Sequence, residues 1–208
     1  MKNIIKRGEK IRLKGLSDEK QICDERGLLQ IGGNHTKVDG SNGQSNESIK
    51  SFGGASTQVH LTTQKKFIEL GLNEESKVFI KLFCGNETID FKGRDRYEIP
   101  DINPINVNAM LDFLNKNKKK VIQLVICNND NINTVVYRNS KNNEILVLSL
   151  STIFDKVDEC TWVALKGGIH LKNKKNETYF HLQREGKKNK SNRYNVLFHI
   201  HANLFKSD

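Results

Sequence analysis

The second half of the chain alternates apolar and polar residues with the two-residue period of β-strands. Two short apolar runs, 77–84 and 121–126, also predict strands, as do the stretches 134–138, 144–150, 161–165, 178–184 and 194–201. Two other segments predict helices. Apolar residues follow Pro104 at helical spacing, which predicts a helix over 104–117, and a short helix is expected near 151–157. The pattern therefore predicts a mixed α/β chain that is rich in strands.

The N-terminal part is expected to contain a short helix. Ser17 followed by Asp18 and Glu19 is typical of a helix start, because a hydroxyl caps backbone N–H groups and acidic residues favour the first turn. The same helix is expected to end near Gly27.

A hairpin is predicted directly after this helix. The segments 36–39 and 47–51 read as strands, and the turn-forming run 40–43 with its polar continuation joins them. Residues 56–62 alternate as a third strand, and a short helical segment over 63–70 follows.

Size and composition bound the location of the protein. A chain of 208 residues with 36% hydrophobic content is long enough for one buried core. Its apolar runs are far shorter than the roughly 20 residues that span a bilayer. Residues 1–7 lack a sustained apolar region, so we expect no secretory signal. The four cysteines form no Cys-x-x-Cys pair, which argues against a zinc cluster and for a reduced, cytoplasmic protein.

Charge points to a polyanionic partner. The formal net charge is +10 at pH 7, and the excess of lysine and arginine is concentrated at 118–120, 172–175 and 187–193. Such a field favours nucleic acid as a partner. A solvated basic surface is the alternative explanation.

The predicted hairpin brings one acid and one lysine together. Asp39 ends the first strand, and Ser48 and Lys50 share one face of the second because strand residues two apart point the same way. A carboxylate beside an ammonium suits phosphodiester hydrolysis: the carboxylate binds Mg²⁺, and the lysine orients or deprotonates water and stabilises phosphorane charge. A surface ion pair in a chance hairpin would have the same sequence pattern.

This order of a strand ending in Asp, a hairpin and a strand with x-Lys resembles the core of PD-(D/E)XK nucleases. Lys-Val-Asp at 37–39 stands where Pro-Asp is commonest, and Ser-x-Lys at 48–50 replaces acid-x-Lys. This is similar to a variant found among type II restriction endonucleases. The small and polar residues that continue to position 60 strengthen the likeness, which covers roughly residues 19–70.

The resemblance implies a restriction-endonuclease-like core, with a central mixed β-sheet flanked by helices, in a single nuclease domain over 1–208. The catalytic core is expected at about 17–84, and the strand-rich part at about 85–208 is expected to recognise DNA and form a homodimer. It also implies Mg²⁺ as cofactor and site-specific cutting of double-stranded DNA to a 5′-phosphate and a 3′-hydroxyl. A cognate DNA methyltransferase is then expected in the same host.

Ser48 stands where a second metal-binding carboxylate is commonest, so another acid must complete the site. The preceding helix offers Glu19 and Glu25, which lie on opposite borders of its inward stripe. A third possibility is that Glu47 turns inward through a β-bulge. The sequence does not choose among these three glutamates.

Polar residues on two predicted strands are candidates for DNA contact. Gln side chains pair with adenine and Arg or Lys with guanine, while lysines bind phosphates. Gln58 is the first specificity candidate, and the full set is Ser56, Thr57, Gln58, His60, Gln183, Arg184, Lys187 and Lys188. A solvent-facing strand end followed by a charged turn would explain the last four equally well.

Other site types find less support. His199 and His201 share one strand face, a spacing seen at metal sites, but a sheet with a partly polar face explains it equally well. The glycine pairs match neither a P-loop nor a dinucleotide fingerprint. The competing function from another class is a non-catalytic DNA- or RNA-binding protein.

Overall fold

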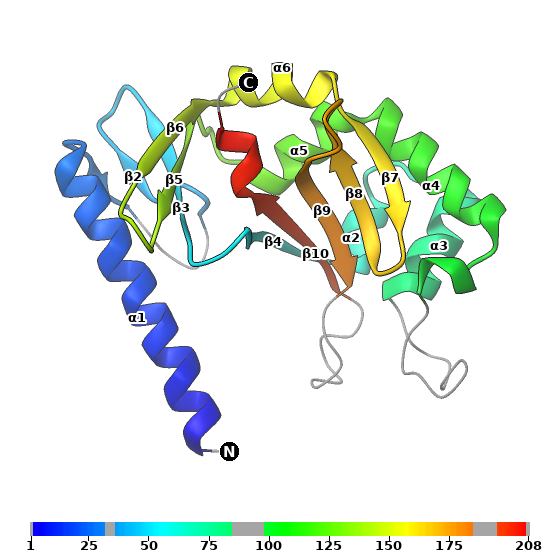
Figure 1. Cartoon of the computed structure of the whole chain (residues 1–208), viewed down its shortest axis with the longest axis horizontal. Coiled ribbons are helices and arrows are strands. Elements are labelled where there is room, and N and C mark those ends of the chain that lie inside the picture. Colours follow the sequence, from blue (N-terminus) through cyan, green and yellow to red (C-terminus); the bar gives the residue numbers. More distant parts are fainter. Residues whose placement is uncertain (1, 32–35, 85–97, 185–194, 207–208) are drawn as a thin grey trace.

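The computed structural model describes residues 2–31, 36–84, 98–184 and 195–206, which form two sheets and several helices (Figure 1). Sheet A has the order β1-β2-β3-β5-β6, and sheet B has the order β4-β10-β9-β8-β7. Sheet A consists of β1 (Leu29–Gln30), β2 (Gly40–Ser41), β3 (Asn46–Phe52), β5 (Thr134–Asn139) and β6 (Ile145–Ser149). Sheet B consists of β4 (Ser56–Thr63), β10 (Asn195–His201), β9 (Thr178–Arg184), β8 (Gly168–Lys172) and β7 (Thr161–Leu165).

The sheets differ in strand direction. In sheet A, β3 and β5 run parallel while the other pairs are antiparallel, and sheet B is antiparallel throughout. The predicted mixed α/β class is therefore confirmed, with the strands divided between two sheets. Strands from both sides of residue 84 pair within each sheet, since β3 pairs with β5 and β4 with β10.

Helices cover one face of sheet B and one face of sheet A. The helical segments are α1 (Lys2–Glu25), α2 (Gln64–Ile68), α3 (Glu74–Cys84), α4 (Pro104–Lys116), α5 (Lys118–Cys127), α6 (Leu150–Asp158), and the 3₁₀ turns η1 (Ile99–Asp101) and η2 (Ala202–Phe205). Helices α2 to α5 contact strands of sheet B, and α1 contacts β1 and β3 of sheet A. None of the helices in the described ranges is both long and apolar enough to cross a membrane.

The main hydrophobic cluster joins sheet B to its helices and reaches the near side of sheet A. Trp162, Phe180 and Phe198 of sheet B are fully buried in it, as are Phe67 of α2 and Phe79 of α3. A smaller cluster, made of Ile22, Cys23, Leu28, Ile49 and Val136, holds the C-terminal part of α1 against sheet A. The rest of α1 extends away from the body of the molecule (Figure 1).

Two predicted strands are helices. The apolar run 77–84 lies in α3, where Asn73 caps the backbone N–H of Ser76 and the buried residues recur at helical spacing. The run 121–126 lies in α5. Both predictions were wrong because tertiary packing overrides the strand preference of short apolar, β-branched runs.

Smaller differences concern the boundaries of elements. Helix α1 begins at Lys2, so Ser17 lies inside it rather than at its start. The first strand of the hairpin is β2 rather than 36–39, and β8 was not predicted. The hairpin itself is confirmed, as are the helix after Pro104 and the short helix α6.

Candidate active site

Asp39 lies directly before β2 and is fixed by several hydrogen bonds. Its backbone N–H donates to the carbonyl of Glu47 at 2.9 Å, which holds it beside β3. Its Oδ2 accepts bonds from the backbone N–H of Ile49 at 2.6 Å, from Lys50 Nζ at 3.0 Å and from Ser48 Oγ at 3.3 Å. The carboxylate therefore has a defined position, and the structure brings Asp39, Ser48 and Lys50 together.

Lys50 is held on the same strand by a second bond. Its Nζ also donates to the carbonyl of Ile49 at 3.0 Å, and its side chain is 19% exposed beside an Asp39 side chain that is 14% exposed. Strand β3 pairs in regular register with β5, so no irregularity turns its side chains. The ammonium and the carboxylate lie close to solvent without being freely hydrated.

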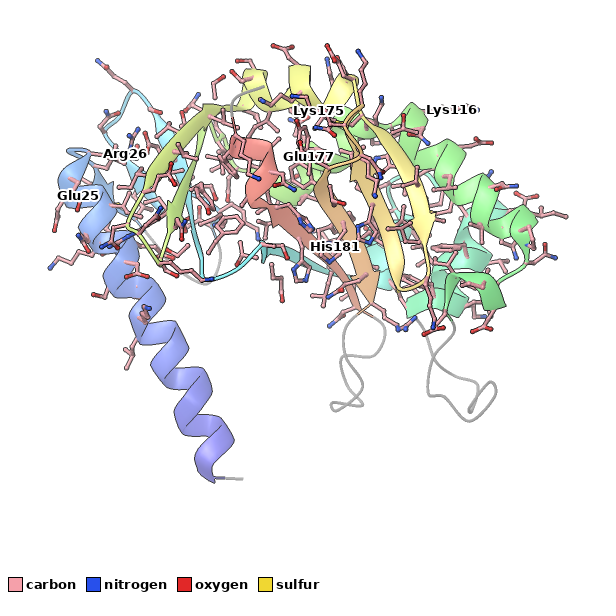
Figure 2. All side chains as sticks on the ribbon, viewed as in Figure 1. Glu25, Arg26, Lys116, Lys175, Glu177 and His181 are labelled. Atoms are coloured by element: carbon pink, nitrogen blue, oxygen red, sulfur yellow. The ribbon has the colours of Figure 1, made fainter. Side chains whose placement is uncertain are left out.

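The two candidate glutamates of α1 have different surroundings. Burial raises the pKa of Glu19, the neighbouring Asp39 raises it further, and Lys50 opposes the increase. Glu25 is exposed and accepts a bond from Gln21 Nε2 at 2.8 Å, near the end of α1 (Figure 2). Glu19 therefore lies in the electrostatic environment of the Asp39–Lys50 pair.

Glu47 faces away from this cluster. It is buried and forms a two-bond ion pair with Arg26, with Nε to Oε2 and Nη2 to Oε1 both at 2.7 Å. The pairing of β2 and β3 continues through Glu47 without a bulge. The alternative in which Glu47 turns inward is therefore wrong, because its charge is already neutralised on the α1 side of the sheet.

Close packing explains why α1 comes near Asp39. A side chain at Gly40 would place its Cβ 2.8 Å from Cys23 Sγ, so only glycine permits this approach. The Sγ of Cys23 also donates to the Asp39 carbonyl at 3.8 Å. Gly40 and Cys23 thus bring the helix that carries Glu19 against the segment that carries Asp39.

Lys37 is a second lysine of the site that sequence reasoning missed. Its Nζ donates to the carbonyl of Val59 at 2.9 Å, and its backbone N–H donates to the carboxylate of Asp130. Burial lowers the pKa of Lys37, and the positive charge of Lys50 lowers it further. The signal was its position two residues before Asp39, since alternate residues of an extended segment share a face.

The site contains oxygen ligands of the kind that Mg²⁺ prefers. Asp39 and Glu19 are two carboxylates that affect each other, and the hydroxyl of Ser48 donates to Asp39. Within the described ranges, no group of three or more His, Cys, Asp or Glu residues is placed to hold a metal ion. Mg²⁺ is commonly held by one or two carboxylates together with water and substrate phosphate, so this set fits it.

The predicted DNA-contact residues are divided between sheet faces. Ser56, Thr57 and Gln58 lie on β4, where Gln58 is exposed. Gln183 of β9 is half-buried and shares a hydrogen bond with His199. The remaining calls, the side chain of His60 and the residues Lys187 and Lys188, lie outside the described part of the chain.

Arg184 lies on the opposite face from Gln183. It is buried, and its guanidinium carbon lies 5.2 Å from the ring centre of Phe83 on α3. Alternation along β9 requires this, because Phe180 and Leu182 of the same face belong to the main hydrophobic cluster. The expected position of Arg184 beside Gln183 on a DNA-facing surface is therefore corrected.

Comparison with known proteins leaves the family open. No family model matches the chain, and no curated protein matches it. A solved structure, restriction endonuclease MspI in complex with its cognate DNA, is similar with a TM-score of 0.49 and 12% sequence identity. The similarity covers 82% of this chain and 66% of that one, so the chain spans less than two thirds of its length. At this level, the similarity identifies neither the family nor the activity of this chain.

Proposed function

We propose that this chain is a Mg²⁺-dependent, site-specific endonuclease that hydrolyses phosphodiester bonds in double-stranded DNA. The observation that carries the proposal is the convergence of Lys50 Nζ, Ser48 Oγ and the Ile49 N–H on one carboxylate oxygen of Asp39, with Glu19 close enough to affect the same charges. Two carboxylates and a lysine beside a sheet end suit the hydrolysis of a phosphodiester. The net charge of +10 favours a polyanionic substrate.

Asp39 and Glu19 would hold the metal ion, and Glu25 would not. When bound, Mg²⁺ supplies positive charge to the phosphate oxygens and neutralises the charge that develops there. Burial and the nearby Asp39 raise the pKa of Glu19, and only the ionised form of this side chain can act as a ligand. Its proximity to Asp39 is therefore an unfavourable arrangement that a divalent cation would relieve.

Lys50 would orient the attacking water and stabilise negative charge on the phosphorane. The new bond joins the water oxygen to phosphorus, and the bond between phosphorus and O3′ breaks. The 3′ oxygen leaves as a hydroxyl after taking up a proton, and the other product carries the 5′-phosphate. Ser48 would keep the Asp39 carboxylate in position through the bond that it already donates.

The wider biological setting is part of the same proposal. A homodimer would cut both strands of a two-fold symmetric site, because the symmetry of the protein then matches that of the DNA. We propose a cytoplasmic enzyme that acts beside a cognate DNA methyltransferase. Ser56, Thr57, Gln58, His60 and Gln183 are proposed contacts to the bases, and Lys187 and Lys188 to the phosphates.

One observation favours a non-catalytic role instead. The Nζ of Lys50 already has two partners, Asp39 and the Ile49 carbonyl, as expected of a purely structural ion pair. A protein that only binds DNA or RNA would need nothing more from this hairpin.

Incubation of the purified chain with unmethylated phage DNA and Mg²⁺ separates the two functions. Discrete fragments that disappear in EDTA would support the nuclease. A gel shift without cleavage, over a series of Mg²⁺ and Mn²⁺ concentrations, would favour the binding protein and end the proposal.

A further inference from the structure

The junction of the two sheets holds a lysine that no described acid pairs with. Strand β4 contacts β3 of sheet A as well as β10 of sheet B, and the chain runs from β3 directly into β4 (Figure 1). Lys37 crosses this junction: its backbone precedes β2, and its Nζ donates to the carbonyl of Val59 on β4 at 2.9 Å. Among the described residues, that carbonyl is the one hydrogen-bond partner of the ammonium.

The backbone around Lys37 is fixed as firmly as its side chain. The Asp130 carboxylate accepts from the backbone N–H of Lys37 and, at 3.1 Å, from the hydroxyl of Thr36. The same hydroxyl accepts from the backbone N–H of Val38 at 3.0 Å. Both ends of the lysine side chain are therefore held, so the ammonium is positioned before any ligand binds.

A second lysine is brought to the same place by the end of α5. Lys66 of α2 is exposed, and its Nζ donates to the side-chain oxygen of Asn128 at 2.7 Å. Asn128 caps α5 and lies two residues before Asp130. The end of α5 thus holds Lys66 through an amide and Lys37 through a carboxylate. We call Lys37 and Lys66 the lysine pair.

Positive charge is in excess around the lysine pair. Burial lowers the pKa of Lys37, Lys50 is the charge that affects it most, and Lys66 lowers it as well. Asp39 and Asp130 oppose the decrease, each by less than Lys50 contributes. Three lysines therefore meet two carboxylates, and one of these, Asp39, already pairs with Lys50. An anion bound here would relieve the repulsion among the lysines.

The ammonium of Lys37 has hydrogen-bonding capacity to spare. A lysine carries three N–H donors, and the described residues accept one of them. A partly buried ammonium that bonds to a single neutral carbonyl is poorly compensated for the water it has lost. A methionine would fill similar space without this cost, so the charge at position 37 points to a ligand rather than to packing.

The position of the lysine pair beside Asp39 selects a phosphate as that ligand. Lys37 lies two residues before Asp39, and two residues of chain span at most about 7 Å. Successive phosphates of one DNA strand are about 3.4 Å apart along the helix axis. A strand with its scissile phosphate at Asp39 and Lys50 would therefore place a neighbouring phosphate within reach of Lys37.

We infer that Lys37 and Lys66 bind a DNA phosphate next to the scissile one and so hold the cleaved strand between β4 and the end of α5. The inference rests on the proposed nuclease function and adds two phosphate contacts to it. A phosphodiester is a compact anion with several acceptor oxygens, and lysine binds such a group as a point charge. Duplex DNA is the source of this phosphate, because the adjacent site is proposed to cut a duplex.

The test measures binding of duplex DNA in EDTA at several salt concentrations. Lys37→Met keeps most of the aliphatic stem and removes the charge, and Lys66→Ala removes an exposed charge. Each should weaken binding about tenfold, and each should lower the slope of log K against log salt by about 0.9. Lys37→Arg keeps the charge and should keep the slope. The matched control Lys175→Ala removes an exposed lysine from the turn between β8 and β9 and should bind as wild type (Figure 2).

A neutral methylphosphonate, placed at one position of the duplex at a time, locates the phosphate. At one position it should weaken binding by the wild-type chain as much as Lys37→Met does. The same substitution should have no further effect on the Lys37→Met variant, because the two changes remove the same contact. Independent, additive losses at every position would contradict the inference.

A purely structural lysine gives a different result. Lys37→Met would then lower stability in urea unfolding while the folded variant kept the affinity and the salt slope of the wild type, and this would overturn the inference. An equal loss of slope in Lys175→Ala would also overturn it, because general charge rather than a defined site would then account for binding.

Three further outcomes are decisive. Lys66→Ala changes an exposed side chain, so unchanged binding in this variant overturns the lysine pair even if Lys37→Met does not fold. A wild-type chain that binds no duplex, or that binds single strands more tightly, would overturn the inference as well. A wild-type chain that binds duplex through both lysines but never cuts it would end the nuclease proposal alone.

Discussion

The two sheets of this protein handle polar groups in opposite ways. Sheet A holds its polar groups as charges: the Asp39–Lys50 pair at 3.0 Å and the Arg26–Glu47 pair at 2.7 Å both border β3. The five described strands of sheet B contain no acid, and burial lowers the pKa of the histidines on one face of this sheet, His181 and His201 most strongly. Opposite charges keep each other ionised, whereas a desolvated group without a counter-ion loses its charge.

This difference separates two tasks that a DNA-cutting enzyme must perform. Bond cleavage requires fixed charges where charge develops in the transition state. Recognition of bases requires donors and acceptors that form favourable hydrogen bonds with one base sequence and contribute little binding energy with another. In our proposal the charged pair of sheet A performs the first task, and polar residues such as the exposed Gln58 of sheet B perform the second. Substitutions in one sheet that leave the other sheet unchanged test whether the two tasks are separate.

The largest effect is expected from the charged pair of sheet A. Asp39→Asn or Lys50→Ala removes a charge that acts on the reacting phosphate, so the Mg²⁺-dependent cleavage rate should fall by on the order of 10³-fold. Binding of duplex in EDTA should change little. Single-turnover cleavage and gel shifts measure both, and full activity in the Lys50 variant would remove that lysine from the mechanism.

A smaller effect on stability is expected from the second pair of sheet A. Arg26→Ala leaves the buried carboxylate of Glu47 without its partner and should lower the free energy of unfolding by about 2 kcal/mol, less than for a fully buried pair because Arg26 is 29% exposed. Urea unfolding followed by circular dichroism gives this value. Lys119→Ala is the control: its pair with Asp158 is half-exposed on both sides, and its loss should leave stability nearly unchanged.

Glu19→Gln tests whether α1 completes the metal site. At limiting Mg²⁺ the rate should fall by about tenfold, whereas Glu25→Gln should behave as wild type. Because the pKa of Glu19 is raised and only its ionised form binds a cation, the Mg²⁺ requirement of the wild type should decrease as pH rises through that pKa. The Gln variant should lose this pH dependence. Equal effects of both substitutions would contradict the assignment of Glu19.

The last prediction concerns the uncharged histidines of sheet B. The pKa of His181 is about 3 in the folded chain and near 6.5 when unfolded, so the unfolded chain binds more protons between these values. Stability should be complete above about pH 7 and decrease on acidification, with a slope of at most about 1.4 kcal/mol per pH unit for each such histidine. His181→Gln should flatten the acid side of the stability curve measured by urea unfolding. An unchanged curve would mean that His181 is already solvated.

The sequence predicts best where structure depends on near neighbours. Asp39 and Lys50 lie eleven residues apart on a hairpin whose turn is rich in turn-forming residues, so local chemistry is sufficient to bring them together. The helix after Pro104 could be predicted equally well, because the proline at its start and the spacing of its apolar residues both indicate a helix. The runs in α3 and α5 were wrongly predicted as strands, because a short apolar run fits the period of a strand as well as that of a helix. Packing against the rest of the protein then selects one of the two.

What the sequence determined by itself is therefore the mixed α/β class, most of the strands and the acid–lysine hairpin, because each depends on residues close together in the chain. Tertiary structure alone decided that Glu19 lies near Asp39, that Glu47 pairs with Arg26, and that Lys37 lies beside the same pair. It also placed Gln58 of β4 opposite His199 of β10, more than a hundred residues away in the chain. Such pairing depends on how distant segments share a buried core, and no local pattern of residue types records it.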